Sequence, residues 1–533
     1  MKSEKKFWLT AVAAYTVAWG WSFFFANAYF WDDWGSFFGK TPEEHAQSWA
    51  GQEKHFLNPY INPILFNLGL WSFRVLIFAL MFGAGVLVYK IITHSKLFSV
   101  GQCQFFTLVF LLLPVNHARF SIQTFEYSFS YFFFFLGWYL LLLRKRVWRV
   151  LALVALLITI GTPSFATFFL LPLANLFYLE RPRSVKDFFK WMLRYTDIYF
   201  LVVGFALYFR TRDLGDNVEK FGLSKFGLFY SLLFGLVLIV MTYLFFNRKR
   251  KTGSITRRQI YIFSGAILIW LGTIPYWSVG YDPIRALPEV FQLHAGARIQ
   301  AGEWFTFSMS ILKLIAGFVV GFLLLTIIKK KSKFSPVLIP NIFMALYLVN
   351  NYFVGPMEWD SRLQLLWPLG LSLIAVGLFE FVPLKFRQQN AIALVVVLTL
   401  MSSLISSEYF VDSLKQRALI SEIQTNVADY GDRQVIISEY KNLLNARDRK
   451  YRAAEWSGIV NSALSGDDGV VGSAIALKDD QSCPVSYRGI ALYPRVKSSF
   501  FESLIKRKVE IEIGRIDLPV RGNSPAIRAC PER

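Results

Sequence analysis

The stretch FWLTAVAAYTVAWGWSFFFANAYFWDDW, residues 7–34, carries the information that decides the fold. Residues 7–29 include no charged side chain. Because an α-helix needs roughly 20 apolar residues to cross the hydrocarbon core, this run predicts a membrane-spanning helix. It is longer than the apolar core of a signal peptide, about 7–15 residues, so we interpret Ala26-Asn27-Ala28 as part of an uncleaved anchor rather than a cleavage site.

The rest of the chain has the composition of a polytopic membrane protein. Of 533 residues, 54% are hydrophobic and 17% aromatic, well above the values of ordinary soluble domains. About 13 stretches before residue 411 have the length expected of a spanning helix. We therefore expect a polytopic α-helical membrane protein. The expected spans are 7–29, 70–92, 98–115, 127–143, 150–160, 165–179, 197–209, 226–246, 260–278, 305–328, 336–354, 363–382 and 391–410.

Basic residues are unevenly distributed between the expected loops. The chain has 57 Lys and Arg against 36 Asp and Glu, a formal net charge of +21. The basic residues gather in every second loop, and the positive-inside rule places those loops and the N-terminus in the cytoplasm. The charge excess therefore reflects topology, and with no aromatic-basic module in the sequence we expect no nucleic-acid partner. The basic segments are 2–6, 90–96, 144–149, 181–194, 248–258, 329–333 and 385–387.

The composition changes at about residue 411, where apolar runs become short and charges are interspersed. We expect a transmembrane domain at 1–410, with its first outer loop at 30–63, and a soluble extracytoplasmic domain at 411–533. Periodicity predicts a small α/β domain, in which Cys483 and Cys530 form one disulfide or remain two thiols. Its expected helices are 412–430 and 440–464, and its expected strands are 434–437, 470–477, 489–492 and 509–513.

The first outer loop contains the most informative polar residues of the chain. Trp31-Asp32-Asp33-Trp34 places two carboxylates at a membrane interface, where charges are costly to hold without a function. Further along the loop, residues 41–56 predict an interfacial helix. Thr41 suits the cap, Pro42 suits the first helical position, and Glu43 and Glu44 suit the positive helix end.

This layout resembles the membrane glycosyltransferases of the GT-C fold class. The shared features are a cytoplasmic N-terminus, one span, an acidic pair at the start of a long outer loop, many further spans and a soluble outer C-terminal domain. The resemblance implies an enzyme that transfers a sugar from a polyprenyl-phosphate carrier to a cell-envelope glycan or glycolipid on the outer face. It also implies that Asp32 or Asp33 is at the reaction centre.

Elementary chemistry gives an independent reason for carboxylates at this position. Displacing a lipid phosphate from an anomeric carbon requires a base for the acceptor hydroxyl, and apolar surroundings raise the pKa of an Asp toward a useful range. One Asp would be the base, and its neighbour would orient a residue or bind a cation, so a divalent cation is an open cofactor option. The alternative is that the pair caps the following segment while Trp31 and Trp34 belong to the interfacial aromatic belt.

A phosphate leaving group also requires positive charge on the outer side, preferably guanidinium. Among the outer arginines we favour Arg362, then Arg298, and include Arg119; for each, a salt bridge or a lipid headgroup contact is the alternative. Glu126 is a candidate second acid, or else a carboxylate that stabilises a helix N-terminus. The residues His55, His117 and His294 show no metal-ligand spacing, and we interpret them as interfacial or core residues.

Two other classes of protein remain as alternatives. A polysaccharide polymerase shares the spans and outer arginines, and a secondary transporter or lipid flippase shares the polytopic architecture. Transporters often contain internal repeats and mid-membrane charges, and neither is evident here. No Walker loop accompanies the spans, which argues against ATP-driven transport. We expect a multi-pass protein of the plasma (inner) membrane, with membrane lipids, a lipid-linked sugar and a glycan or glycolipid acceptor as its partners.

Overall fold

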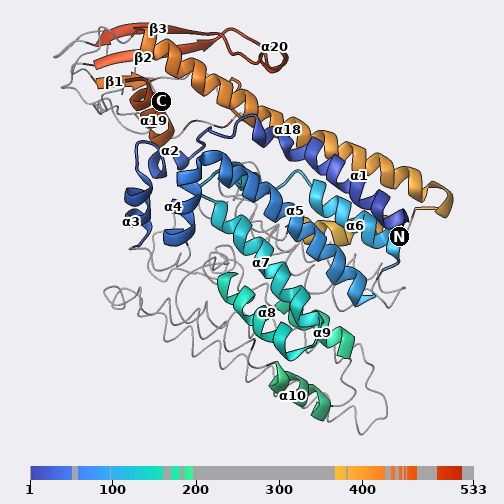
Figure 1. Cartoon of the computed structure of the whole chain (residues 1–533). Helices are drawn as coiled ribbons and strands as arrows, with labels where there is room; N and C mark the ends of the chain where they lie inside the picture. The colour runs from blue at the N-terminus through green and yellow to red at the C-terminus, as the bar shows by residue number, and fades with distance from the viewer. Residues whose placement is uncertain are drawn as a thin grey trace, which may run out of the picture.

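The structure, a computed structural model, describes a largely helical chain that ends in a small sheet (Figure 1). The described residues are 2–50, 58–96, 98–159, 170–180, 185–195, 198, 367–379, 382–426, 434–437, 443–446, 449, 451, 453–464 and 489–518.

Three of the described helices are long and apolar enough to cross a membrane. They are α5 (Leu70–Ser95), α7 (Phe125–Leu142) and most of α18 (Leu384–Asn426). This confirms the expected membrane class, although three is far fewer than the 13 spans expected. The five expected spans between residues 197 and 354 lie, except for Ile198, outside the described residues.

Shorter helices complete the described part of the bundle. The expected first span, 7–29, is α-helical only as far as Trp19, where α1 ends and a short 3₁₀ helix at Gly20–Phe23 follows. Helix α1 is not one of the three helices long and apolar enough to cross a membrane, so this span stays a prediction. A capping box formed by Ser99 and Gln102 starts α6 and satisfies backbone groups at that end. The shorter helices are α1 (Lys2–Trp19), α6 (Val100–Leu112), α8 (Arg146–Ile158), α9 (Leu170–Glu180), α10 (Val185–Arg194) and α17 (Trp367–Phe379).

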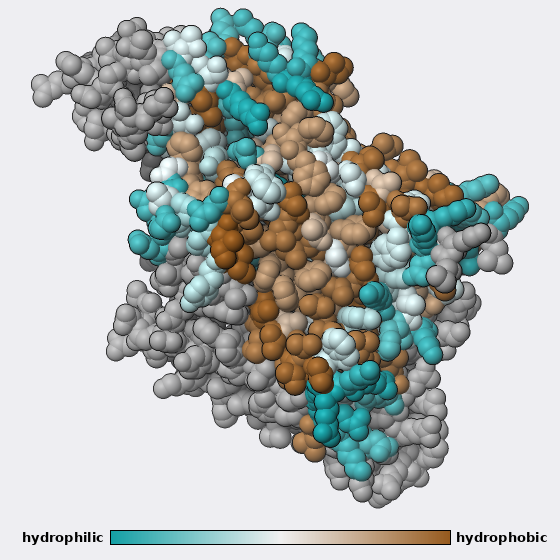
Figure 2. Space-filling model, viewed as in Figure 1, coloured by the Kyte–Doolittle hydropathy of each residue, from teal (hydrophilic) through white to brown (hydrophobic). Residues whose placement is uncertain are grey.

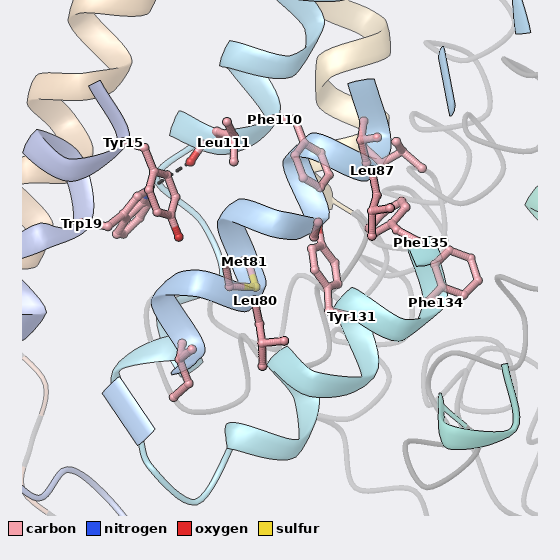
Figure 3. Close-up of a cluster of buried hydrophobic side chains, with 14 of the residues drawn as sticks. Tyr15, Trp19, Leu80, Met81, Leu87, Phe110, Leu111, Tyr131, Phe134 and Phe135 are labelled. Atoms are coloured by element: carbon pink, nitrogen blue, oxygen red, sulfur yellow. Dashed lines mark hydrogen bonds between the residues drawn. The ribbon is translucent and has the colours of Figure 1, made fainter. Parts of the chain in front are cut away.

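The helices of the bundle pack closely where a glycine lets two backbones approach each other. A Cβ on Gly137 of α7 would lie 2.7 Å from the Leu156 Cγ of α8, so only glycine permits this contact. Figure 3 shows the aromatic centre between α1, α5, α6 and α7, where Trp19 donates from Nε1 to the Leu111 carbonyl at 2.9 Å. Buried aromatic rings such as Tyr131 fill the space between these helices.

The surface of the described part has the polarity of a membrane protein. Hydrophobic side chains cover the middle of the visible face, and hydrophilic ones gather at its two ends (Figure 2). One hydrophilic end lies over the C-terminal part and α3, and the other lies near the N-terminus. The apolar zone has the polarity expected of a surface that contacts the hydrocarbon layer. We call the end with the C-terminal part the outer end, after the orientation that the positive-inside rule predicts.

Helix α18 joins the bundle to the C-terminal part without a break. Its 43 residues give a length of about 65 Å at 1.5 Å per residue, more than twice the hydrocarbon thickness. It packs on α1 in the bundle, and it also contacts α19 (Ala453–Leu464) and α20 (Phe500–Lys506). One helix therefore runs through residues 410 and 411, where the composition placed a domain boundary; that division into two domains stays a prediction.

The C-terminal part contains a three-stranded sheet. Strand β1 (Gln434–Ile437) pairs in parallel with β2 (Gly489–Val496), which pairs antiparallel with β3 (Ile511–Leu518). The bounds of β1 agree with the predicted strand, whereas β2 extends four residues beyond its predicted end at Leu492. The expected strand at 470–477, Cys483 and Cys530 lie outside the described residues.

The described residues of the first outer loop, 30–50 and 58–63, include two short helices and the start of a third. They are α2 (Asp33–Ser36), α3 (Pro42–Ala50) and α4 (Asn58–Leu68). The predicted start of α3 is confirmed, because the Thr41 hydroxyl accepts from the Glu44 amide at 3.2 Å while the Glu44 carboxylate accepts from the Thr41 amide at 2.8 Å. A second outer segment, residues 113–124, connects α6 to α7 and contains a 3₁₀ helix at His117–Phe120.

Candidate functional site

The two adjacent carboxylates of the first outer loop have different environments. Asp32 is the N-cap residue of α2 and its side chain is partly exposed, whereas Asp33 is fully buried. The preceding residue, Trp31, has a φ of +51°, a left-handed conformation that costs a non-glycine residue about 1–2 kcal/mol. The chain therefore makes a strained turn that presents one carboxylate outward and the next inward.

Asp33 uses all of its acceptor capacity within the protein. Oδ1 accepts from the Ser121 hydroxyl at 2.6 Å and from the Gln123 amide at 2.8 Å. Oδ2 accepts from the amides of Ile122 at 3.0 Å and Phe30 at 3.1 Å. A carboxylate offers about four lone-pair sites, and these four donors occupy them. Asp33 therefore fastens the first outer loop to the second outer segment.

Burial and hydrogen bonding act in opposite directions on the Asp33 carboxyl. Burial is the largest influence and raises the pKa of Asp33, while Arg74, Ser121 and the backbone amides lower it. Donors from rigid backbone do not leave when a substrate arrives, so the carboxylate is not free to take a substrate proton. The geometry makes Asp33 a structural anchor of the turn.

Arg74 supports the same junction from α5. Its guanidinium donates from Nη2 to the Ala28 carbonyl at 2.8 Å and from Nη1 to the Phe120 carbonyl. It also lies 5.5 Å from the ring centroids of Phe25 and Phe30, within the range of cation–π attraction. Arg74 thus joins residues 25–30, which follow α1, to the second outer segment, and its positive charge acts on the Asp33 carboxylate.

Arg119, expected to bind phosphate, lies inside the helix bundle. Its guanidinium is 3.9 Å from the ring centroid of Trp19, and Nε donates to the Asn116 carbonyl at 3.2 Å. Its Nη1 is buried and has no hydrogen-bond partner in the described structure. Burial lowers the pKa of Arg119. The structure shows a packing role on Trp19, and phosphate binding by Arg119 stays a prediction.

The remaining predicted site residues fall into two groups. Glu126 is described and lies in the first turn of α7, where a carboxylate stabilises the positive helix end. His117 is buried, and its Nε2 lies 3.2 Å from the carbonyl oxygen of Pro114, as expected for a core residue. Arg298 and Arg362 lie outside the described residues, as do His55 and His294.

The two tryptophans of the acidic motif are buried beneath the C-terminal part. Trp31 is 2% exposed and Trp34 is 5% exposed, so in this structure neither ring lies in an interfacial belt facing lipid. Trp34 packs with a hydrophobic cluster from α18 and α19 that includes Leu419 and Ile459. A Cβ on Gly458 would lie 2.6 Å from Cδ2 of Trp34 and closer still to Cε3, so glycine is needed for α19 to approach this ring.

A group of buried charges, the Arg449 cluster, completes this junction. It consists of Trp31, Asp412, Arg449, Tyr451 and Glu455. Arg449 donates from Nη1 to both Glu455 oxygens at 2.7 Å and from Nη2 to Asp412 at 3.1 Å. Tyr451 donates its hydroxyl proton to Asp412, and Glu455 accepts from the Trp31 amide at 3.1 Å. The guanidinium lies 5.1 Å from the Trp31 ring centroid.

The charges in this cluster balance one another. Burial by itself lowers the pKa of Arg449, but the carboxylates of Glu455 and Asp412 outweigh burial and raise it. Arg449 therefore stays protonated, and two carboxylates can be held away from water beside it. Sequence reasoning missed this cluster, because charged residues spaced along an amphipathic region carry no local sign that they will meet in a buried site.

The described residues do not form a metal centre. No three His, Cys, Asp or Glu side chains among them come together in a way that could hold a metal ion. The divalent cation left open by the sequence therefore remains unassigned to residues.

Comparison with known proteins adds no relative. The chain matches no protein-family model, no curated protein and no solved structure. Functional inference therefore rests on the residues and their geometry.

Proposed function

We propose that this protein is a membrane glycosyltransferase of the GT-C kind, acting at the outer face of the plasma membrane. In this proposal the chain has about 13 spans with a cytoplasmic N-terminus and an extracytoplasmic C-terminal domain. It transfers a sugar from a polyprenyl-phosphate carrier to a cell-envelope glycan or glycolipid. The observation that carries the proposal is the different environment of the two carboxylates. Asp33 is buried and anchors the turn, whereas Asp32 is partly exposed at its tip.

The proposed reaction is a displacement at the anomeric carbon. The acceptor hydroxyl oxygen forms the new bond to that carbon, the bond from carbon to phosphate oxygen breaks, and the lipid phosphate leaves. Asp32 takes the hydroxyl proton as general base, a role worth about 10²–10⁴-fold in rate. Positive charge at the leaving phosphate would come from Arg362, Arg298 or Arg119.

The position of the pair supports this role. The hydrophilic outer end borders the apolar zone of the surface, so a lipid-linked donor could remain in the bilayer while its sugar reaches the outer loops. Two outer segments and the C-terminal part meet at residues 30–36, as the contacts of Asp33 and Trp31 show. Convergence of loops on a rigid helical scaffold is a common way to build a site.

The experiment is a surface-glycan profile by mass spectrometry of cells that lack the protein. The cells are complemented with wild type, Asp32→Asn, Asp33→Asn or Glu43→Gln, the last a control at an exposed acid of the same loop. We expect Asp32→Asn to lose the glycan at a normal protein level, Asp33→Asn to lose it together with protein, and Glu43→Gln to restore it.

Full restoration by Asp32→Asn, at wild-type protein level, would contradict the proposal. It would favour the transporter or flippase class, in which an outer carboxylate need not take a proton from an acceptor. Loss of the glycan in the deletion strain alone does not separate these classes, so the comparison of the two Asp variants decides.

A further inference from the structure

We infer that Glu455 is a positioning residue that holds Asp32 through the backbone of Trp31. Glu455 and Trp31 are 424 positions apart in the chain. This inference rests on the proposed function and deepens it, because it assigns the C-terminal part a role in the reaction site. Glu455 reaches neither a substrate nor a reacting atom in this assignment. It acts by fixing the residue that directly precedes the proposed base.

The strained turn at Trp31 is the first argument. Its φ of +51° is a conformation that a bulky side chain rarely adopts, and such outliers persist only where surrounding contacts impose them. Within the loop, the Asp33 amide donates to the Phe30 carbonyl at 3.0 Å and closes the turn. Further contacts come from outside the loop. The Trp31 amide donates to Glu455, and the Trp31 ring packs with both the Arg449 guanidinium and the ring of Tyr409.

The fixed neighbours of Asp32 are the second argument. On one side Trp31 is held by Glu455, and on the other Asp33 is held by four donors. Asp32 is thus the partly exposed member of a turn whose flanking residues are both anchored. A base held in this way keeps its carboxylate in one place relative to the outer loops, as catalysis by orientation requires.

The immobilisation of Glu455 is the third argument. Both of its oxygens accept from Arg449, and Arg449 in turn bonds Asp412 on α18. The acceptor for Trp31 is therefore fixed to the long helix that continues into the membrane bundle. The position of the turn depends in this way on how the C-terminal part is docked.

Two conservative variants separate positioning from simple charge neutralisation. Glu455→Gln keeps an oxygen at the same reach for the Trp31 amide, but it loses the charge and replaces one acceptor of Arg449 by an NH₂ group. Glu455→Asp keeps the charge for Arg449 but withdraws it by one methylene from Trp31. Ser462→Ala, on the same helix, is the matched control.

Each full-length variant is assayed in two ways. Amide hydrogen exchange of the protein in lipid nanodiscs reports on residues 30–34, and the glycan profile is measured at matched protein level beside Asp32→Asn. Positioning predicts that Glu455→Asp raises exchange at residues 30–34 by about 10-fold or more and lowers the glycan, both by more than Glu455→Gln does, while Ser462→Ala stays near wild type.

The contrary results are equally definite. The inference is overturned if Glu455→Asp retains the glycan and slow exchange while Glu455→Gln loses both, because charge pairing would then be what matters. It is also overturned if exchange at residues 30–34 is unchanged in Glu455→Asp. If Asp32→Asn restores the glycan, the proposed function fails, and the exchange data still decide whether Glu455 holds this backbone.

Discussion

The Arg449 cluster and the Asp33 site both bury charges at the outer end, and both hold residues 30–36, but they do so with different chemistry. In the Arg449 cluster a guanidinium bonds two carboxylates directly. In the Asp33 site the carboxylate accepts from a hydroxyl and three backbone amides, and Arg74 donates to carbonyls instead. The first joins segments far apart in the sequence, and the second joins neighbouring outer segments.

The difference shows what a single substitution would leave behind in each site. A buried ion pair is of little net benefit when intact, but removing one partner leaves an uncompensated charge. When a carboxylate that accepts from backbone amides is substituted, several hydrogen bonds are lost at once, because those amides cannot turn toward other acceptors. The following predictions, from the largest expected effect to the smallest, use this contrast.

Arg449→Ala should have the largest effect. It leaves Asp412 and Glu455 buried without their cation, at a cost of about 3–5 kcal/mol in the free energy of unfolding. The C-terminal part should then detach, which limited proteolysis after residue 426 would detect as faster cleavage than in wild type. Unchanged proteolysis and thermal unfolding would show that the cluster does not hold the junction.

Asp33→Asn should rank next, because an amide NH₂ would face the donors that now bond an oxygen. Leaving those donors unsatisfied costs about 1–3 kcal/mol, and more if several are affected. The neighbouring Asp32→Asn, at a partly exposed side chain, should lower the free energy of unfolding by less than Asp33→Asn does. The stability of both variants is measured by thermal unfolding in the same lipid discs. Equal losses of stability would contradict the distinction between the two carboxylates.

Gly458→Ala tests the C-terminal junction without changing any charge. The added methyl group would meet the Trp34 ring, and overpacking of this kind costs about 1–3 kcal/mol. The measurement is hydrogen exchange of α19 and residues 30–36, which should be faster in the variant than in wild type. The control is Gly35→Ala, where a Cβ would meet no atom within 4 Å, and a similar change there would contradict the steric argument.

His45 provides the smallest and most localised effect. Its Nδ1 lies 2.9 Å from the Ser36 carbonyl and its Nε2 lies 3.4 Å from the Asn62 amide nitrogen, contacts that link α3 to α2 and α4. Burial lowers the pKa of His45 below its ordinary 6.5, so the unfolded chain binds the proton more readily. Its contribution is complete above pH 6.5 and is lost as the pH falls through the lowered pKa.

We therefore expect hydrogen exchange of α3 and α4 to be faster at pH 5.5 than at pH 7.5, after correction for intrinsic exchange. The change corresponds to about 1 kcal/mol or less. His45→Gln, which cannot titrate, should show no such difference between the two pH values. A pH response as large in this variant as in wild type would assign the effect to another group.

Local patterns predicted several elements correctly. The start of α3 at Pro42, the strand at Gln434–Ile437 and the long apolar helix beginning at Leu70 follow from capping, alternation and hydrophobic length. Each depends on residues a few positions apart, which the sequence displays directly. The break expected near residue 411 was a change of composition, and α18 passes through it because helix propensity continues while only the surroundings change.

The candidate site was only partly predictable. The acidic pair was found from its position at the end of the first span, but the roles of its two members were not. Asp33 meets Ser121 across 88 positions of sequence, and Trp31 meets Glu455 across 424. No local pattern encodes a contact at that separation.

The sequence by itself determined that this is a helical membrane protein with an acidic motif directly after its first apolar run, because hydrophobic length and capping act locally. Only the tertiary structure decided that Asp33 is buried, that Asp32 is partly exposed, and that Trp31 and Trp34 pack beneath the C-terminal part. The physical reason is that burial and hydrogen-bond pairing depend on segments brought together by folding, and the same side chain can be an exposed base or a buried anchor according to what they place around it.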